Sequence, residues 1–301
     1  MSIPFSIQRS SPEQRTDALR VLHQGLPPDQ QIGLLQALQA TTGQGEGLFD
    51  GLFVASDGTK IENAAWCQLA PGRTACMWLP NDQLVGAIEL MKVAADFLDQ
   101  RRITVAQFLA AADDTLSQEL LFAADFHKLA RLAYLWVDCE RFSSQKPTSR
   151  LQFESQAYNQ PKRLGKLFLQ TYEDSLDCPQ LNGVRSPAEV IESYAQQGDF
   201  SPDRWFFVRR DGRDIGALIL AAHLETHNWE LAYMGLVPTA RGQGFGRDVL
   251  NYAIWYAKSR HAQRFVLAVD EANQPAVDTY SGAGFEAWDH RTVFARLRPR
   301  E

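Results

Sequence analysis

A glycine-rich loop between an apolar strand and an amphipathic helix constrains the fold of this chain more than any other stretch. Residues 231–237 are mostly apolar and precede Pro238, which predicts a strand, and residues 247–258 place apolar side chains on one helical face. The glycines between them are Gly242, Gly244 and Gly246. Glycine adopts φ > 0 and lets a ligand approach the backbone closely. Because a helix N-terminus exposes unpaired N–H groups and the positive end of the helix dipole, this stretch predicts a phosphate-binding site.

The order of residues in the loop separates three kinds of phosphate site. A P-loop needs Lys and then Ser or Thr after its last glycine, and here Arg247 and Asp248 follow. A dinucleotide fingerprint needs Gly-x-Gly-x-x-Gly, and this loop has Gly-x-Gly-x-Gly. Residues 241–246 do match Arg/Gln-x-x-Gly-x-Gly/Ala. That pattern resembles the acetyl-CoA pyrophosphate loop of the GCN5-related N-acetyltransferases, the GNAT family, with an ordinary glycine-rich turn as the alternative.

A second motif downstream supports the same resemblance. After a strand that ends at Asp270, the chain has the spaced residues Asn273, Ala276, Tyr280, Gly284 and Phe285. This spacing resembles the GNAT segment that lies beside the pantetheine arm and the thiol of the cofactor. Two motifs in the correct order therefore favour the GNAT fold over an isolated turn.

The element order predicts an internal duplication. Each half has the pattern β-α-α-β-β-β-α-β-α-β, and turns, prolines and helices correspond at a shift of about 158 residues, as between Pro80 and Pro238. A polar stretch at residues 143–149 separates the halves. We predict an α/β chain of two tandem GNAT-like (acyl-CoA N-acyltransferase) domains, with mixed, mostly antiparallel sheets flanked by helices. The predicted domains are residues 1–145, a degenerate copy, and residues 146–301, the acetyl-CoA-binding copy.

The resemblance implies cofactor contacts residue by residue. In the family, the strand before the loop splays from its neighbour and binds pantetheine and the acyl carbonyl through its backbone, which implies these roles for Leu236 and Val237. The loop would present N–H groups to the pyrophosphate. The implied cofactor-binding residues are thus Leu236, Val237, Arg241, Gly242, Gln243, Gly244, Phe245, Gly246, Arg247 and Asn273. Asn273 is also expected to cap the helix that follows it.

The resemblance also implies the reaction, which is direct attack of a primary amine on acetyl-CoA. Tyr280 matches the tyrosine that protonates the departing thiolate, with a helix-face tyrosine packed in the core as the alternative. Glu230 lies where one branch of the family carries its general base, with a solvated strand glutamate as the alternative. We therefore predict an acyltransferase with Tyr280 and Glu230 as catalytic residues. A non-catalytic acyl-CoA sensor or binding module is the rival function.

A polar segment at residues 171–185 is expected to line the acceptor site, as the corresponding region does in the family. The candidate acceptor contacts are Tyr172, Glu173, Asp177, Cys178 and Asn182. For each of them a well-capped loop is the alternative. Cys178 as an acyl-carrying nucleophile is disfavoured, because the family transfers the acyl group directly. The acceptor is predicted to be an amine, on either a small molecule or a protein.

The first half departs from the motifs. Its counterpart of the glycine loop, residues 81–88, has a single glycine and opens with Asn81 and Asp82. Aligning Phe126 with Phe285 puts Leu121 at the Tyr280 position, and aligning the prolines puts Gly72 at the Glu230 position. We expect no acetyl-CoA turnover in this half. It resembles the degenerate half of tandem GNAT proteins with the architecture of mycothiol synthase, without implying that substrate.

Composition excludes several other classes. A net charge of −6 argues against a nucleic-acid partner, and no apolar run approaches the ~18 residues of a membrane span. The N-terminus lacks the apolar core of a signal peptide, and none of the four cysteines forms a Cys-x-x-Cys pair. His223 and His227 have no third ligand nearby, so we predict no metal. We expect a cytoplasmic protein that is a monomer or a weak dimer.

Overall fold

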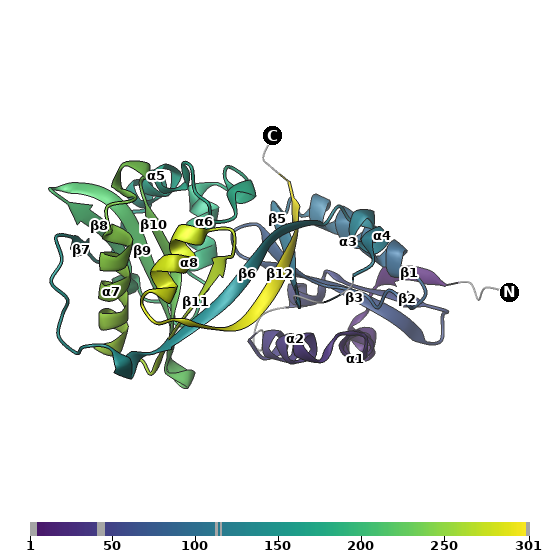
Figure 1. Cartoon of the computed structure of the whole chain (residues 1–301). Coiled ribbons are helices and arrows are strands. Elements are labelled where there is room, and N and C mark those ends of the chain that lie inside the picture. The colour runs from purple at the N-terminus through teal and green to yellow at the C-terminus, as the bar shows by residue number, and fades with distance from the viewer. Residues whose placement is uncertain (1–4, 41–45, 112–113, 115, 299–301) are drawn as a thin grey trace. The chain divides into compact units, whose positions relative to one another are not determined.

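The structure is a computed structural model that describes residues 5–40, 46–111, 114 and 116–298. Its contacts divide the chain into two compact units (Figure 1). The first unit comprises Met1–Lys128 and Val293–Glu301, and the second unit comprises Leu129–Thr292.

The second unit is built on a mixed sheet. Its strands are β6 (His127–Asp138), β7 (Gln152–Glu154), β8 (Trp205–Arg210), β9 (Arg213–His223), β10 (Asn228–Leu236) and β11 (Arg264–Asp270). They lie in the order β6-β11-β10-β9-β8-β7. Strands β10 and β11 are parallel, and the other neighbouring pairs are antiparallel. A parallel pair inside an otherwise antiparallel sheet is the mixed arrangement that the sequence predicts.

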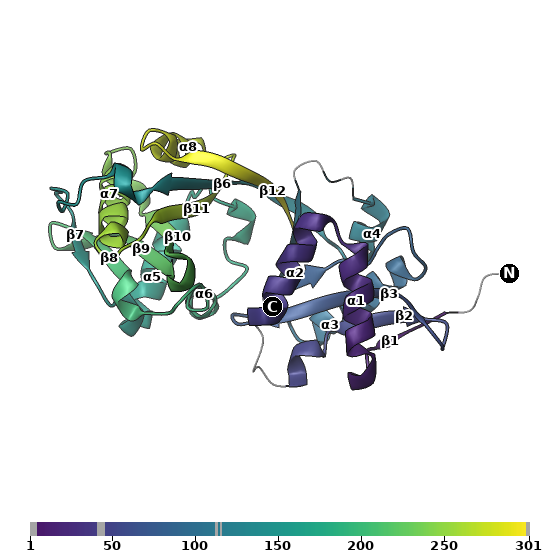
Figure 2. The same ribbon diagram turned by 90° about the horizontal axis from the view of Figure 1, so that it is seen from below.

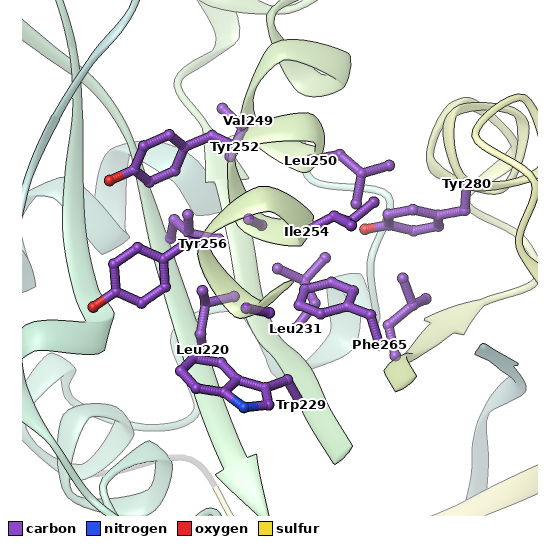
Figure 3. Close-up of a cluster of buried hydrophobic side chains, with 14 of the residues drawn as sticks. Leu220, Trp229, Leu231, Val249, Leu250, Tyr252, Ile254, Tyr256, Phe265 and Tyr280 are labelled. Carbon is purple, nitrogen blue, oxygen red and sulfur yellow. The ribbon is translucent and has the colours of Figure 1, made fainter. Parts of the chain in front are cut away.

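Helices cover both faces of this sheet (Figure 2). They are α5 (Pro161–Tyr172) and α6 (Pro187–Tyr194) on one face, and α7 (Phe245–Lys258) and α8 (Gln274–Ser281) on the other. The predicted apolar face of α7 is confirmed, because Val249, Leu250 and Ile254 are buried. They pack with Trp229 and Phe265 of the sheet in one cluster (Figure 3). Burial of such side chains against a sheet is worth about 1.5–3 kcal/mol each, which fixes α7 on this face.

The first unit repeats this design. Its elements are β1 (Ser6–Arg9), α1 (Arg15–Gly25), α2 (Pro28–Ala40), β2 (Leu52–Ser56), β3 (Ile61–Ala70), β4 (Thr74–Trp78), α3 (Ala87–Gln100), β5 (Val105–Ala111) and α4 (Gln118–Ala123). The strands follow the order β1-β2-β3-β4-β5, with β4 and β5 parallel. Helices α1 and α2 lie on one face, and α3 and α4 on the other (Figure 1). The predicted duplicated element order is confirmed.

The last strands of the two halves are exchanged, which the sequence did not predict. Strand β6 closes the first half in sequence, yet from Leu129 onward it belongs to the second unit, where it pairs with β11. Strand β12 (Glu286–Leu297) closes the second half, yet from Val293 onward it belongs to the first unit, beside β5. There Phe294 stacks on Phe108, with ring centroids 5.1 Å apart.

The exchange explains why the compact units differ from the predicted domains. The proposed ranges 1–145 and 146–301 mark the two copies of the repeat, whereas the units follow contacts. Apart from the exchanged strands, the first strand of the second half, β7, has only 3 residues. It ends at Glu154 because Gln156 takes the left-handed conformation (φ 65°) and starts a 3₁₀ turn.

Candidate active site

The two parallel strands of the second unit part where the site begins. Their paired residues end at Glu230 and Val266, although β10 continues to Leu236 and β11 to Asp270. Strand β10 stays paired with β9 as far as Leu236, with a register shift between Leu231 and Tyr233. Such a bulge bends a strand and increases its twist. The edge of β10 that faces β11 therefore carries backbone groups without a strand partner.

A pocket of about 410 Å³ occupies the gap between the parting strands. Its lining comes from β10, from the end of β11, from the end of α5 and the segment after it, from α6, from the start of the glycine loop and from α8. Leu236, Arg241, Gly242, Asn273, Asp177 and Tyr280 are the predicted site residues among the lining. The fold thus brings residues from six separate stretches of sequence to one opening.

The glycine loop lies at the start of α7 with open space around it. Gly242 and Gly244 have φ of 72° and 80°, the left-handed region where glycine is favoured. A Cβ added at either of them, or at Gly246, would meet no atom within 4 Å. Across the described residues, no acceptor is recorded for the backbone N–H groups of residues 242–246. Free N–H groups at a helix N-terminus, with room in front of them, can bind a phosphate.

Two arginines that sequence analysis missed lie beside this loop. The guanidinium groups of Arg210 and Arg150 lie 4.7 and 5.2 Å from the centre of the Phe245 ring. Arg210 also donates to the Gln243 side chain, at 3.3 Å. Arg247 contacts the carbonyl of Gly282, at 3.5 Å, and keeps its side chain at the surface. Arg150 and Arg210 are distant from the loop in sequence, so no local pattern could have found them.

The guanidinium group of Arg241 forms hydrogen bonds with the protein backbone. Its guanidinium donates to the carbonyls of Leu236, Asp174 and Thr171, at 3.0, 2.9 and 2.9 Å. These bonds tie the segment after α5 to the end of β10. The structure therefore assigns to the Arg241 side chain the positioning of the pocket wall, whereas sequence analysis expected it at the cofactor.

Tyr280 both packs in the core and lines the pocket. It is 6% exposed, and its ring contacts Phe285 at 5.8 Å between centroids. Figure 3 shows the ring reaching from α8 toward the sheet, with the hydroxyl leading. No hydrogen bond from this hydroxyl is recorded within the described part of the chain. Burial raises the pKa of Tyr280 well above its ordinary value, so the phenol is protonated and available to donate.

Glu230 lies apart from Tyr280. Its carboxylate contacts His223 Nε2 at 3.0 Å, which raises the pKa of the His223 imidazole. Because Trp229 and Leu231 face α7, strand alternation turns Glu230 to the opposite face. Glu230 does not line the pocket that contains Tyr280. The structure therefore does not bring the two predicted catalytic residues together in one pocket.

The predicted acceptor contacts divide into lining residues and loop supports. Asn182 donates its side-chain amide to the carbonyl of Tyr172, at 3.0 Å, and so stabilises the loop. Burial raises the pKa of Tyr172 to about 12, and Glu173 is exposed outside the pocket. Burial, followed by Asp177 and Asp270, raises the pKa of the Cys178 thiol to about 12, which disfavours a nucleophilic thiolate there. Asp177 is the one of these five candidates that lines the pocket.

Two further expectations need correction. The N–H of Val237 donates to Ile215, at 2.9 Å, so it is not free for a cofactor. Asn273 precedes α8, but its side chain makes no capping hydrogen bond. Its backbone carbonyl instead accepts from the N–H groups of Ala276 and Val277, at 3.0 and 3.1 Å. The Asn273 side chain is therefore not used as a helix cap, and the residue lines the pocket.

The first unit has a shorter counterpart of β10. Its parallel pairs end at Cys76 and Gln107, and three residues separate Cys76 from Pro80. In β10, seven residues separate Glu230, the last residue paired with β11, from Pro238. The strand position equivalent to Glu230 is thus Cys76, and the predicted alignment with Gly72, which lies in a turn, is wrong. The missing residues are those that form the bulged, splayed part of β10.

Gly86, the single glycine of the loop at residues 81–88, lies in filled space. Gly86 precedes α3 with φ of 74°, as Gly244 precedes α7. A Cβ at Gly86 would lie 2.8 Å from Ala55 and 3.0 Å from Phe5, whereas Gly244 faces open space. The alignment of Leu121 with Tyr280 is confirmed, because each carbonyl accepts from the phenylalanine N–H five residues later, at 3.0 and 3.1 Å.

Known proteins resemble this chain in two ways. The model of the Acetyltransferase (GNAT) family matches residues 168–285. A mycothiol acetyltransferase of Acidothermus cellulolyticus is 30% identical over 122 residues, which are 36% of this chain and 37% of that protein. A mycothiol acetyltransferase of Thermomonospora curvata is 34% identical over 86 residues, 29% of each chain. The matched stretches thus span 37% and 29% of the length of these two relatives.

A solved structure extends the likeness of the fold over almost the whole chain. The GCN5-related N-acetyltransferase from Sphaerobacter thermophilus has a TM-score of 0.58 and 13% sequence identity, and the match covers 97% of this chain and 95% of that chain. The predicted fold and the resemblance to the GNAT family are confirmed, and the match to the family's acetyltransferase model covers residues 168–285. In the part of the chain that the structure describes, no helix is long and apolar enough to cross a membrane.

Proposed function

Because residues 168–285 match the GNAT acetyltransferases, we propose that the C-terminal half transfers an acetyl group from acetyl-CoA to a primary amine by direct attack. One observation carries this proposal. The parted strands β10 and β11 open a pocket that contains the Tyr280 hydroxyl, and the open glycine loop lies beside it. A long thioester cofactor with a pyrophosphate at one end fits such a combination of groups.

In this proposal, the N–H groups of residues 242–246 bind the pyrophosphate, and Arg150 and Arg210 add positive charge beside them. The pantetheine arm lies along the free edge of β10, where Leu236 lines the pocket. The thioester then reaches Tyr280. A protonated phenol beside the sulfur can protonate the thiolate as it leaves, which lowers the barrier for breaking the C–S bond.

Several points support the finer parts of the proposal. The relatives' name, mycothiol acetyltransferase, supports an acetyl donor, while a match over about a third of the chain does not carry their acceptor over. The filled space at Gly86 and the leucine at position 121 support a first half that does not use acetyl-CoA. We also propose a cytoplasmic location, for which the four free cysteines are the support, and a monomer or weak dimer without a metal.

The proposal is tested by following the release of free thiol from acetyl-CoA in the presence of a panel of amines. Amine-dependent release supports a transferase, and tight binding without amine-dependent release would support the rival, an acyl-CoA sensor. Tyr280→Phe should lower kcat by about 10²–10⁴, the range for general acid catalysis, while acetyl-CoA affinity is kept. The loss should be smaller with an acyl donor whose thiol has a low pKa.

A matched control is available in the same core. Tyr252 is buried in the cluster that contains Tyr280 but does not line the pocket. Tyr252→Phe removes a buried hydroxyl in the same way and should leave kcat within a few-fold of the wild type. Equal losses in the two variants would assign Tyr280 to packing.

A further inference from the structure

We propose that Asp177 binds the acceptor as an ammonium ion and takes the proton that the amine must lose before it attacks. The acceptor would then be a cationic, basic amine. This inference rests on the proposed acetyl transfer and assigns the base of that reaction to a residue other than Glu230.

The position of Asp177 is the first support. It lies in the segment between α5 and α6 and lines the pocket that also contains Tyr280. Its Oδ1 accepts a hydrogen bond from the N–H of Asp270, at 3.4 Å, which ties it to the end of β11. The neighbouring Cys178 N–H donates to the Asp270 carboxylate, at 3.3 Å. Asp177 is therefore held beside the gap between the parting strands.

The chemical surroundings of Asp177 favour a cation. The pocket wall near it includes Asp174, Tyr194 and Tyr233, which supply a second carboxylate and aromatic rings. Within the described ranges, no Lys, Arg or His is recorded in an ion pair with Asp177. Arg241, which also lines the pocket, donates to backbone carbonyls. A carboxylate that faces a pocket without a cationic partner can accept a ligand ammonium.

The second support is independent of the carboxylates. The Tyr280 hydroxyl belongs to a residue that is 94% buried, lines the same pocket and has no recorded hydrogen-bond partner in the described chain. The hydroxyl is not among the fully enclosed side-chain atoms without a partner in the described chain, so it is open to the pocket, where a ligand can form a hydrogen bond with it. The pocket thus has a proton donor and a proton acceptor that face one space. Glu230, in contrast, is paired with His223 and lies outside the pocket.

The electrostatics of Asp177 suit a base. Asp177 is exposed at the mouth of the pocket, but the protein that surrounds its carboxyl group raises the pKa of that group. The hydrogen bond from the Asp270 N–H lowers the pKa, and the negative charge of the Asp270 carboxylate raises it; the net shift is upward. The titratable or charged groups around it are Asp270 of β11, Tyr280 of α8, Tyr194 of α6, Tyr172 of α5, Tyr233 of β10, Cys178, Asp174, Arg185 and Arg241. A higher pKa makes the carboxylate a stronger proton acceptor toward an ammonium ion.

The proton balance closes as follows. Asp177 takes one proton from the ammonium and releases it to solvent, which leaves a neutral amine. The nitrogen lone pair forms the N–C bond with the thioester carbonyl, and the C–S bond then breaks. Tyr280 protonates the sulfur, and the second proton lost by the nitrogen restores the Tyr280 phenol. The products are the amide, free CoA thiol and one proton.

The test compares Asp177→Asn with the wild type on two probes, an n-alkylamine that is an ammonium ion at neutral pH and an aniline that is neutral there. We expect kcat/KM for the alkylamine to fall by about 10²–10⁴, and the rate with the aniline to fall much less. In the wild type, protonation of Asp177 should add to the fall of the alkylamine rate at low pH, and this added fall should be lost in the variant, which keeps only the fall due to ionisation of the amine itself. Glu192→Gln, an exposed carboxylate of α6 outside the pocket, is the matched control.

Two further measurements keep the inference apart from the proposed function. Calorimetry should show that Asp177→Asn keeps acetyl-CoA binding and loses alkylammonium binding to the CoA-bound protein. If the wild type binds alkylammonium through Asp177 but shows no transfer with any amine, the proposed function fails and the ammonium site stands. Equal losses for both amines, or a full loss in Glu230→Gln with none in Asp177→Asn, would overturn the inference.

Discussion

A substitution in the glycine loop can test the proposed phosphate site without lowering the stability of α7, the helix that begins there. Gly246 is the second residue of α7, has open space in front of its Cα and does not take a positive φ. A side chain there is not strained, whereas any side chain at Gly244 must adopt φ near 80°. Gly246→Glu therefore places one negative charge beside the predicted pyrophosphate without a backbone penalty.

Gly246→Glu should raise the stability of the free protein and lower its affinity for acetyl-CoA. Without cofactor, replacing a helical glycine and adding an acidic residue to the first turn should raise the unfolding free energy by about 1 kcal/mol. With cofactor, a carboxylate at ~6 Å repels each phosphate charge by about 0.7 kcal/mol in water and about 2.8 kcal/mol at an effective dielectric constant of ~20. For two charges, this weakens acetyl-CoA binding by about 10-fold to 10⁴-fold.

Calorimetry of acetyl-CoA binding and thermal melting of the free protein check both signs. Gly246→Gln is the matched control, because it has the same length without the charge, and Gly246→Ala follows the Gly/Ala pattern of the loop. The difference between the Glu and Gln variants should shrink as salt is raised, since the charges are near the surface. Equal acetyl-CoA affinity for the Glu and Gln variants at low salt would refute the assignment of this loop to the pyrophosphate.

Three more predictions follow from the same structure. Arg241→Gln should lower the unfolding free energy by about 2–4 kcal/mol, measured by denaturant titration, because it removes charged hydrogen bonds to three carbonyls; an unchanged stability would return Arg241 to the cofactor. The pKa of His223 is raised by its hydrogen bond to Glu230, so this pair stabilises the fold at pH values below the unfolded pKa of ~6.5. The stabilisation is lost as the pH rises through the folded pKa. His223→Gln should therefore lower the unfolding free energy at pH ~5.5 and leave it unchanged at pH ~9. A loss of the same size at both pH values would point to packing. Titration calorimetry should give one acetyl-CoA per chain, and two equivalent sites would show that the first half has kept the cofactor site.

Local patterns in the sequence predicted the parts of the fold that local physics decides. The apolar period of α7 and the glycines before it each act within a few residues, and both lie where they were expected. The duplicated order could be predicted for the same reason. Each helix or strand carries its own signal, and the two halves repeat the series.

The remaining features depend on contacts between residues distant in sequence. Arg241 looked like a phosphate ligand because it precedes the loop, yet its partners at Thr171 and Asp174 come from a segment about 70 residues away. No local pattern in the sequence distinguishes Arg150 and Arg210 from other arginines. The structure places both guanidinium groups against the Phe245 ring, beside the glycine loop. The sequence places Glu230 near the loop, but strand alternation and the pairing with His223 turn it to the other face.

The exchanged strands have a consequence for how the chain is made. The sheet of the first unit includes residues 293–297 of β12, which lie beside β5. Strand β5 itself is complete at Ala111. At a synthesis rate of about 5–20 residues per second, roughly 10–40 seconds pass on the ribosome before that partner emerges. During this time the edge of β5 has open N–H and C=O groups, the kind of edge through which strands aggregate. The half that is translated first is thus the half that finishes folding last, and a fragment cut near residue 145 would never finish.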